Sequence, residues 1–119
     1  MPFLVEKLEV YQKALNFADR ITSLTESFPR GKYYLVDQLN RAALSIAANI
    51  AEGNGRRMPK DRRNFFVIAR GSVLECLPLL EIARRRTLIG PKTHSELLAD
   101  LETISKMLSG LIHKDSSRT

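Results

Sequence analysis

Apolar residues recur at steps of three and four along almost all of this 119-residue chain, and this spacing constrains the fold more than any other feature. The step is the period of one face of an α-helix, whereas a half-buried strand is apolar at alternate residues. No stretch alternates β-branched and polar residues, so strands are not predicted. The spacing predicts an all-α protein, and the length suits one domain with its own core.

Helix-breaking residues divide the periodic pattern into four segments. Four helices joined by short connections predict an up-down-up-down four-helix bundle. The tail, residues 113–119, is expected to fray. The predicted helices cover residues 4–27, 34–52, 59–86 and 94–112.

The predicted helix ends depend on a few residues. Pro29 disfavours helix at the residue before it, and Gly31 permits a turn. Gly53 is predicted to close the second helix in a left-handed conformation. Pro59 suits the first turn of the third helix, where its missing N–H is no loss. The T-x-x-E pattern that begins at Thr93 is typical of a capping box.

The third predicted helix is apolar on two faces, which predicts burial on two sides. A single small bundle has difficulty in burying both, so we expect the second face to lie at a subunit interface. Pro78 removes a backbone hydrogen bond and is expected to kink this helix. Gly71 costs about 1 kcal/mol relative to alanine, which predicts close approach of another backbone. The interface is predicted at Phe66, Val73, Leu77 and Leu80.

The net charge of +6 is concentrated in residues 56–86, where nine basic residues face three acidic ones. Basic excess confined to one segment indicates an acidic partner, and a solvated arginine-rich surface is the alternative interpretation. Cations at the start of a helix oppose its dipole, so the cluster "GRRMPKDRR" favours phosphate contact over helix stabilisation. The predicted nucleic-acid-binding residues are Arg56, Arg57, Lys60, Arg62, Arg63, Arg70, Arg84, Arg85 and Arg86.

Polar residues form short rows on two of the predicted helices. Ser45, Asn49 and Glu52 are spaced by four and three, and Ser72 and Glu75 by three. We interpret them as a structural hydrogen-bonded strip between the helices, with Glu52 paired to an arginine, because buried polar groups need partners. An acid–base site is the alternative. No nucleophile, base and orienting group occur together, so an enzyme is not predicted.

Several other classes of protein are not predicted. The glycines at 53 and 55 are followed by no Lys-Ser/Thr pair, as a phosphate-binding loop requires. One cysteine, Cys76, and two distant histidines do not make a metal site, and no cofactor is predicted. Cys76 is expected to be a buried free thiol. No apolar run approaches a membrane span or a signal peptide, so we expect no membrane partner and a cytoplasmic location.

Four segments carry a resemblance to a known family: "LEVYQKAL", "QLNRAALSIAANIAEGNGRR", "FFVIARGSVLE" and "KMLSGLI". Together they resemble the proteins encoded in intervening sequences of bacterial 23S ribosomal RNA genes, often called S23 or intervening-sequence proteins. The resemblance implies a four-helix bundle, a homopentamer and no established enzymatic activity. A more distant similarity is to the accessory variability determinant of diversity-generating retroelements, a basic pentamer that works with a reverse transcriptase and nucleic acid.

The chain departs from the usual pattern of that family at a few positions, which bear on the course of the third helix. We therefore expect a non-catalytic bundle that forms a homo-oligomer and binds RNA or another polyanion. A protein-interaction scaffold without a nucleic-acid partner is the alternative. The departures are Ala47, Met58, Pro59, Arg62, Arg70 and Pro78.

Overall fold

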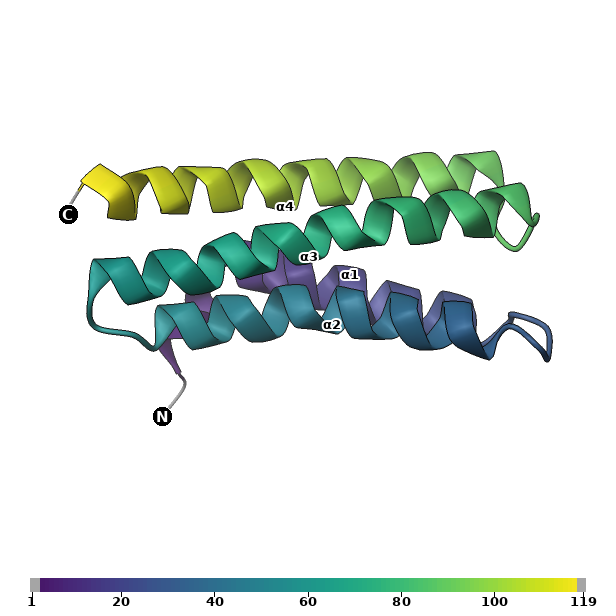
Figure 1. Cartoon of the computed structure of the whole chain (residues 1–119), viewed down its shortest axis with the longest axis horizontal. Coiled ribbons are helices and arrows are strands. Elements are labelled where there is room, and N and C mark those ends of the chain that lie inside the picture. Colours follow the sequence, from purple (N-terminus) through teal and green to yellow (C-terminus); the bar gives the residue numbers. More distant parts are fainter. Residues whose placement is uncertain (1–2, 118–119) are drawn as a thin grey trace.

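A computed structural model describes residues 3–117 of the chain. It contains a short 3-10 helix, η1 (Leu4–Lys7), and four α-helices: α1 (Glu9–Thr25), α2 (Tyr33–Asn54), α3 (Pro59–Arg85) and α4 (Pro91–Ser117). The helices run alternately up and down in an elongated bundle of 46 × 29 × 21 Å (Figure 1). The predicted all-α four-helix bundle is confirmed. Packing is densest between α2 and α3 and sparsest between α1 and α4.

The ends of two helices differ from the prediction. The first predicted helix is interrupted at Leu8, whose extended backbone separates η1 from α1. Helix α4 begins at Pro91 rather than at residue 94 and continues through Ser117, so residues 113–117, which were expected to fray, are helical. Asp115 in this last part is buried, with 2% of its surface exposed, which holds the final turns against α3. Residues 118 and 119 of the predicted tail lie outside the described residues.

Gly31 and Gly53 are both needed as glycines, but for different reasons: one for its backbone conformation and the other for close packing. Gly31 has a φ of +92°, as the predicted turn requires. The prediction that Gly53 closes α2 is wrong, because the helix continues to Asn54 and Gly53 is helical. A Cβ on Gly53 would lie 2.7 Å from Cε1 of Phe66. Glycine is therefore needed at this position so that the Phe66 ring of α3 can lie against the backbone of α2.

The core is built from one apolar face of each helix, as the spacing predicts. Small residues of α2, among them Ala43 and Ala47, are buried where α2 meets its neighbours. The largest fully buried side chains are Val10, Phe17, Ile21, Leu39, Ile46, Ile50, Phe66, Leu80, Leu97, Leu101, Ile104 and Leu108.

The predicted subunit interface is wrong for three of its four residues. Phe66, Val73 and Leu80 are buried in the core of the single chain and cannot contact a second copy directly. The physical reason is that α3 packs against α2 on one side and α4 on the other, so one bundle buries both apolar faces. Leu77 is the exception, with 37% of its surface exposed.

The two residues that were unfavourable for a helix both lie on the solvent side of α3. The helix continues from Pro59 to Arg85 with Pro78 inside it, and Pro78 is exposed. Gly71 is also exposed, and nothing lies within 4 Å of a Cβ built on it. The close backbone approach predicted at Gly71 therefore does not occur within one chain.

We predict that Gly53→Ala destabilises the protein by about 1–2 kcal/mol. Its methyl group would overlap the buried Phe66 ring, and overpacking of a core costs about 1–3 kcal/mol, more than the helix propensity of alanine returns. Gly110→Ala in α4 is the matched control, since its Cβ meets nothing within 4 Å. It should be neutral or stabilise by up to about 1 kcal/mol. Urea unfolding followed by circular dichroism measures both, and a Gly53→Ala protein as stable as the control contradicts the account.

Candidate nucleic-acid interface

A short hydrogen-bonded strip joins α2 to α3 at the middle of the bundle. The hydroxyls of Ser45 and Ser72 are 2.8 Å apart, and the Asn49 amide donates to the Ser45 carbonyl (2.9 Å) and hydroxyl (3.1 Å). Glu52 and Glu75 were predicted to belong to the strip, but both are exposed. The predicted pairing of Glu52 with an arginine is confirmed, since Glu52 accepts a hydrogen bond of 3.0 Å from Arg56, one turn later. The strip therefore consists of three neutral side chains, and the bond between Ser45 and Ser72 is the one that links the two helices.

The start of α3 presents cations beside the turn that follows α2. The Arg56 guanidinium pairs with Glu52 and lies 4.7 Å from the centre of the Phe65 ring, which fixes it against the protein. Arg57 and Lys60 are exposed, and neither has a side-chain bond or ion pair with any residue between 3 and 117. These two charges are available to a partner.

Three further arginines of the predicted set connect α3 to α4. Arg62 forms an ion pair with Asp115, with Nε and Oδ2 3.6 Å apart. Arg70 donates to the Ser109 hydroxyl at 3.2 Å, and Arg63 donates to a hydroxyl on the last turns of α4. Since Asp115 is almost fully buried, removal of Arg62 would leave a buried charge unpaired. We assign these arginines to the stability of the bundle.

At the other end of α3, one carboxylate forms ion pairs with two of the arginines. Glu81 accepts hydrogen bonds from Arg84 (3.0 and 2.7 Å) and from Arg85 (2.9 Å). The hydrogen bonds from Arg84, and then those from Arg85, lower the pKa of Glu81 to about 2. Glu81 is therefore ionised throughout the physiological range and offsets part of the positive charge. Arg86 is exposed and has no such partner within residues 3–117.

The nine predicted cations thus do not converge into one patch. Helix α3 has 27 residues, which at 1.5 Å per residue separates its ends by about 40 Å. Five cations lie near the first turns, three near the last, and Arg70 lies between them. The charges without a partner inside the described part of the chain are Arg57 and Lys60 at one end and Arg86 at the other.

The structure also reveals exposed aromatic residues that the sequence analysis did not single out. Tyr33 and Tyr34 begin α2, and 76% of the surface of each is exposed. They lie at the same end of the bundle as Arg86, where the loop before α2 and the loop after α3 are close in Figure 1. An aromatic pair directly after Lys32, at a helix start, is the sequence signal that could have indicated them.

The cysteine is buried, and the acidic residues between 3 and 117 are not grouped as metal ligands. Burial, and to a smaller extent the charge of Glu75, raises the pKa of the Cys76 thiol to about 12, so it stays protonated. Within residues 3–117, no three histidine, cysteine or acidic side chains are grouped as metal ligands would be. None of the helices in this range has the length and apolarity to cross a membrane.

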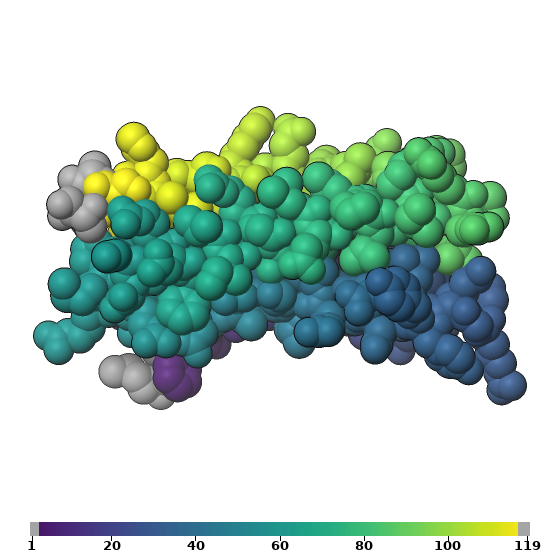
Figure 2. Space-filling view, in the orientation of Figure 1, coloured from purple at the N-terminus to yellow at the C-terminus, as the bar shows by residue number. Residues whose placement is uncertain are grey.

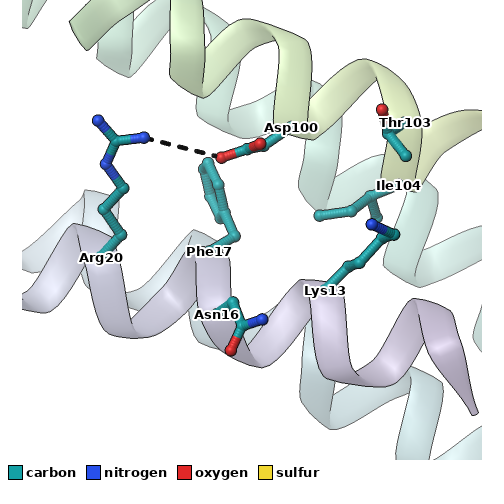
Figure 3. A pocket seen from close by; sticks show the side chains of 7 residues that line it. All are labelled: Lys13, Asn16, Phe17, Arg20, Asp100, Thr103 and Ile104. Atoms are coloured by element: carbon teal, nitrogen blue, oxygen red, sulfur yellow. Dashed lines mark ion pairs between the residues drawn. The ribbon is translucent and has the colours of Figure 1, made fainter.

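A small polar cavity lies in the sparsely packed seam between α1 and α4 (Figure 3). Arg20 reaches across the seam to Glu96 at 2.6 Å and to Asp100 at 4.0 Å. The hydrogen bond from Arg20 lowers the pKa of Glu96, which keeps the pair charged. Lys13 lines the opposite part of the cavity. Because Arg20 is already matched by two acids, this cavity has little attraction for an anion, and its contacts hold α1 to α4.

The outward side of α3 is apolar over most of its length. Val67, Ile68 and Leu74 are exposed there, and Leu74 retains 59% of its surface. Leu74 and Leu77 also border an apolar groove against α4. In Figure 2, α3 crosses the middle of the visible face, with α2 on one side and α4 on the other, so its outward side is open to a partner.

The chain is similar in sequence to one protein family and in structure to a solved member of the S23 ribosomal protein family. The family model described as "23S rRNA-intervening sequence protein" matches residues 6–110. The crystal structure of a protein with unknown function from the S23 ribosomal protein family of Bacteroides thetaiotaomicron is similar, with a TM-score of 0.80 and 28% sequence identity. The similarity covers 87% of this chain and 97% of that chain. No curated protein matches the chain.

Proposed function

The chain belongs to the 23S rRNA-intervening sequence protein family, and we propose that this member binds RNA without catalysing a reaction. The observation that carries the proposal is the division of the cations. Arg57, Lys60 and Arg86 are exposed and have no acid partner within residues 3–117, whereas the intramolecular contacts of Arg62 and Arg70 occupy those side chains. A phosphate backbone is bound through cations that can replace its counterions.

The start of α3 adds a second attraction for phosphate. Met58 precedes the helix and supplies no side-chain cap, so N–H groups of the first turn lack a capping side chain. Such groups, together with the positive end of the helix dipole, bind anions. Arg57 precedes this turn, and Lys60 lies within it. The position of these cations, which is unfavourable for the helix alone, is accounted for by an anionic partner.

We predict that the double variant Arg57→Ala with Lys60→Ala weakens RNA binding and its dependence on salt. Loss of two phosphate contacts should make the slope of log K against log salt shallower by about 1.4 on single strands, at about 0.7 per contact. Every RNA sequence should be affected alike, because phosphate contacts carry little sequence information. Filter binding at several salt concentrations measures the slope.

The matched control is Lys13→Ala with Arg41→Ala, which removes the same charge from exposed positions on α1 and α2. This control should retain most of the affinity. Equal losses in both double variants would mean that net charge alone attracts RNA. Absence of binding by the wild-type protein even at low salt would reject the proposed function.

A second proposal is that copies of the chain associate through the outward side of α3. The exposed residues Val67, Ile68 and Leu74 lie around Gly71. Glycine in a helix lowers stability relative to alanine, and no contact between residues 3 and 117 requires glycine at this position. A helix from a second copy could approach closely at a residue without a side chain. A closed homo-oligomer accounts for both features, and five subunits is the number that the family resemblance implies. A different protein on this face is the alternative, and it would leave the purified chain monomeric.

We predict that Leu74→Arg dissociates the oligomer, because an unpaired charge in a dry interface costs several kcal/mol. Light scattering with size-exclusion chromatography measures the mass of the wild type and the variant. Leu44→Arg on α2 is a control of equal exposure, since both leucines retain 59% of their surface, and it should leave the mass unchanged. A wild-type protein that is monomeric at micromolar concentration contradicts self-association and supports the alternative partner.

A further inference from the structure

A narrow groove opens between the start of α2 and the last turns of α3, at the end of the bundle that carries Arg86. Its apolar floor consists of Leu35, which is buried, Leu79, which is half-buried, and Ile82, which is exposed. Tyr34 also lines the groove, and most of the surface of this residue is exposed to solvent. Lys32 and Arg86 also line it. An apolar floor, an exposed aromatic ring and two cations therefore occur together within one small site.

The charge around the groove is strongly positive. The two segments that form this end, residues 28–37 and 81–92, contain six lysine and arginine residues and two acids. One of the acids, Glu81, is occupied by Arg84 and Arg85. Lys32 and Arg86 have no ion pair with any residue between 3 and 117. An anionic ligand is therefore attracted here, and a cationic one is repelled.

The dimensions favour a small planar group over a whole molecule. The volume of the groove is about 220 Å³, below the roughly 300–1,000 Å³ of sites that enclose a complete small ligand. The planar ring of a ligand can enter such a space while the charged part of the same ligand stays at the rim. Large aromatic side chains usually bury much of their surface, so Tyr34 with 76% of its surface exposed offers a ring face to a ligand.

We infer that this groove holds one unpaired base of a single-stranded RNA, stacked against Tyr34, while Lys32 and Arg86 contact the adjoining phosphates. The inference rests on the proposed RNA-binding function and assigns its base contact. Stacking of bases on aromatic side chains beside a cationic track is the general mode of single-strand binding, and it tolerates any base sequence. A duplex cannot use the groove in this way, because its bases are already stacked inside the helix.

A second copy of the chain fits the groove poorly. Every copy carries the same positive end, and like charges brought together at an interface oppose association. The apolar side of α3 around Gly71, proposed above for self-association, has no exposed basic residue and a single exposed acid, Glu75, so the repulsion between positive ends does not act there. A base with its phosphates supplies both the planar ring and the negative charge that the groove lacks.

The test compares three probes of equal length: a single-stranded uridine oligonucleotide, the same backbone without bases, and an RNA duplex. The wild-type protein should bind the uridine strand more tightly than the abasic strand. Tyr34→Ala should weaken binding of the uridine strand by about tenfold and remove this preference, since one stacking contact is lost. Tyr34→Phe, which keeps the ring, should bind as the wild type does.

Tyr33→Ala is the matched control, because Tyr33 is as exposed as Tyr34 but does not line the groove. It should retain the affinity and the preference for bases. Arg86→Ala should weaken the uridine and abasic strands by the same factor. Thermal unfolding of each variant verifies that the fold is intact, as expected for exposed side chains.

Three results would overturn the inference in different ways. If the wild type binds all three probes equally, or if Tyr34→Ala keeps the preference for bases, the proposed function stands and the base site is wrong. If Tyr33→Ala loses as much as Tyr34→Ala, stacking is not located in the groove. If no probe binds at low salt, the proposed RNA-binding function fails, and the base site fails with it.

Discussion

The close packing of α2 against α3 is the contact on which the rest of this structure depends. It is possible because Gly53 leaves space for the Phe66 ring and because alanines line much of the buried side of α2. The hydrogen bond between Ser45 and Ser72 adds a polar link at a defined level along the two helices. This bond favours the register in which the two hydroxyls meet, because a shift of one helix along the other would break it.

The position of α3 then determines which arginines are available. Side chains that point from α3 towards α4 meet Asp115 and Ser109 and become part of the bundle. Those at the two ends extend beyond the packed region, where Arg57 and Arg86 meet no acid within residues 3–117. The same helix therefore stabilises the fold along its length and presents charge at its ends. This division supports RNA binding at two separate places, about 40 Å apart, in preference to one continuous patch.

The sequence predicted those features of the fold that depend on residues close together in the chain, namely the helices and the turn at Gly31. The period of the apolar residues identified four helices, and α2 and α3 agree with prediction to within a few residues at each end. The turn at Gly31 followed from glycine and proline chemistry. The burial of Phe66, Val73 and Leu80 could not be found in this way, because it depends on how α2 and α4 together cover α3.

Contacts between distant parts of the chain account for the other differences. The helical structure of residues 113–117 depends on Asp115, whose partner Arg62 is on another helix. The role of Gly53 likewise depends on a ring in the next helix and not on the end of its own. For the site, the sequence located the cations. The structure was needed to show that Arg62 is paired with Asp115 while Arg57 is not, and that Tyr34 and Arg86 line the same groove.

The central claim, that the arginines divide into structural and binding groups, can be measured directly by NMR of the arginine Nε–H groups in the ¹⁵N-labelled protein. During titration with single-stranded RNA at low salt, the account predicts shifts for Arg57 and Arg86 and unchanged signals for Arg62 and Arg70. Shifts of Arg62 and Arg70 equal to those of Arg57 and Arg86, or no shift of Arg57 and Arg86 while the strand is bound, would contradict it.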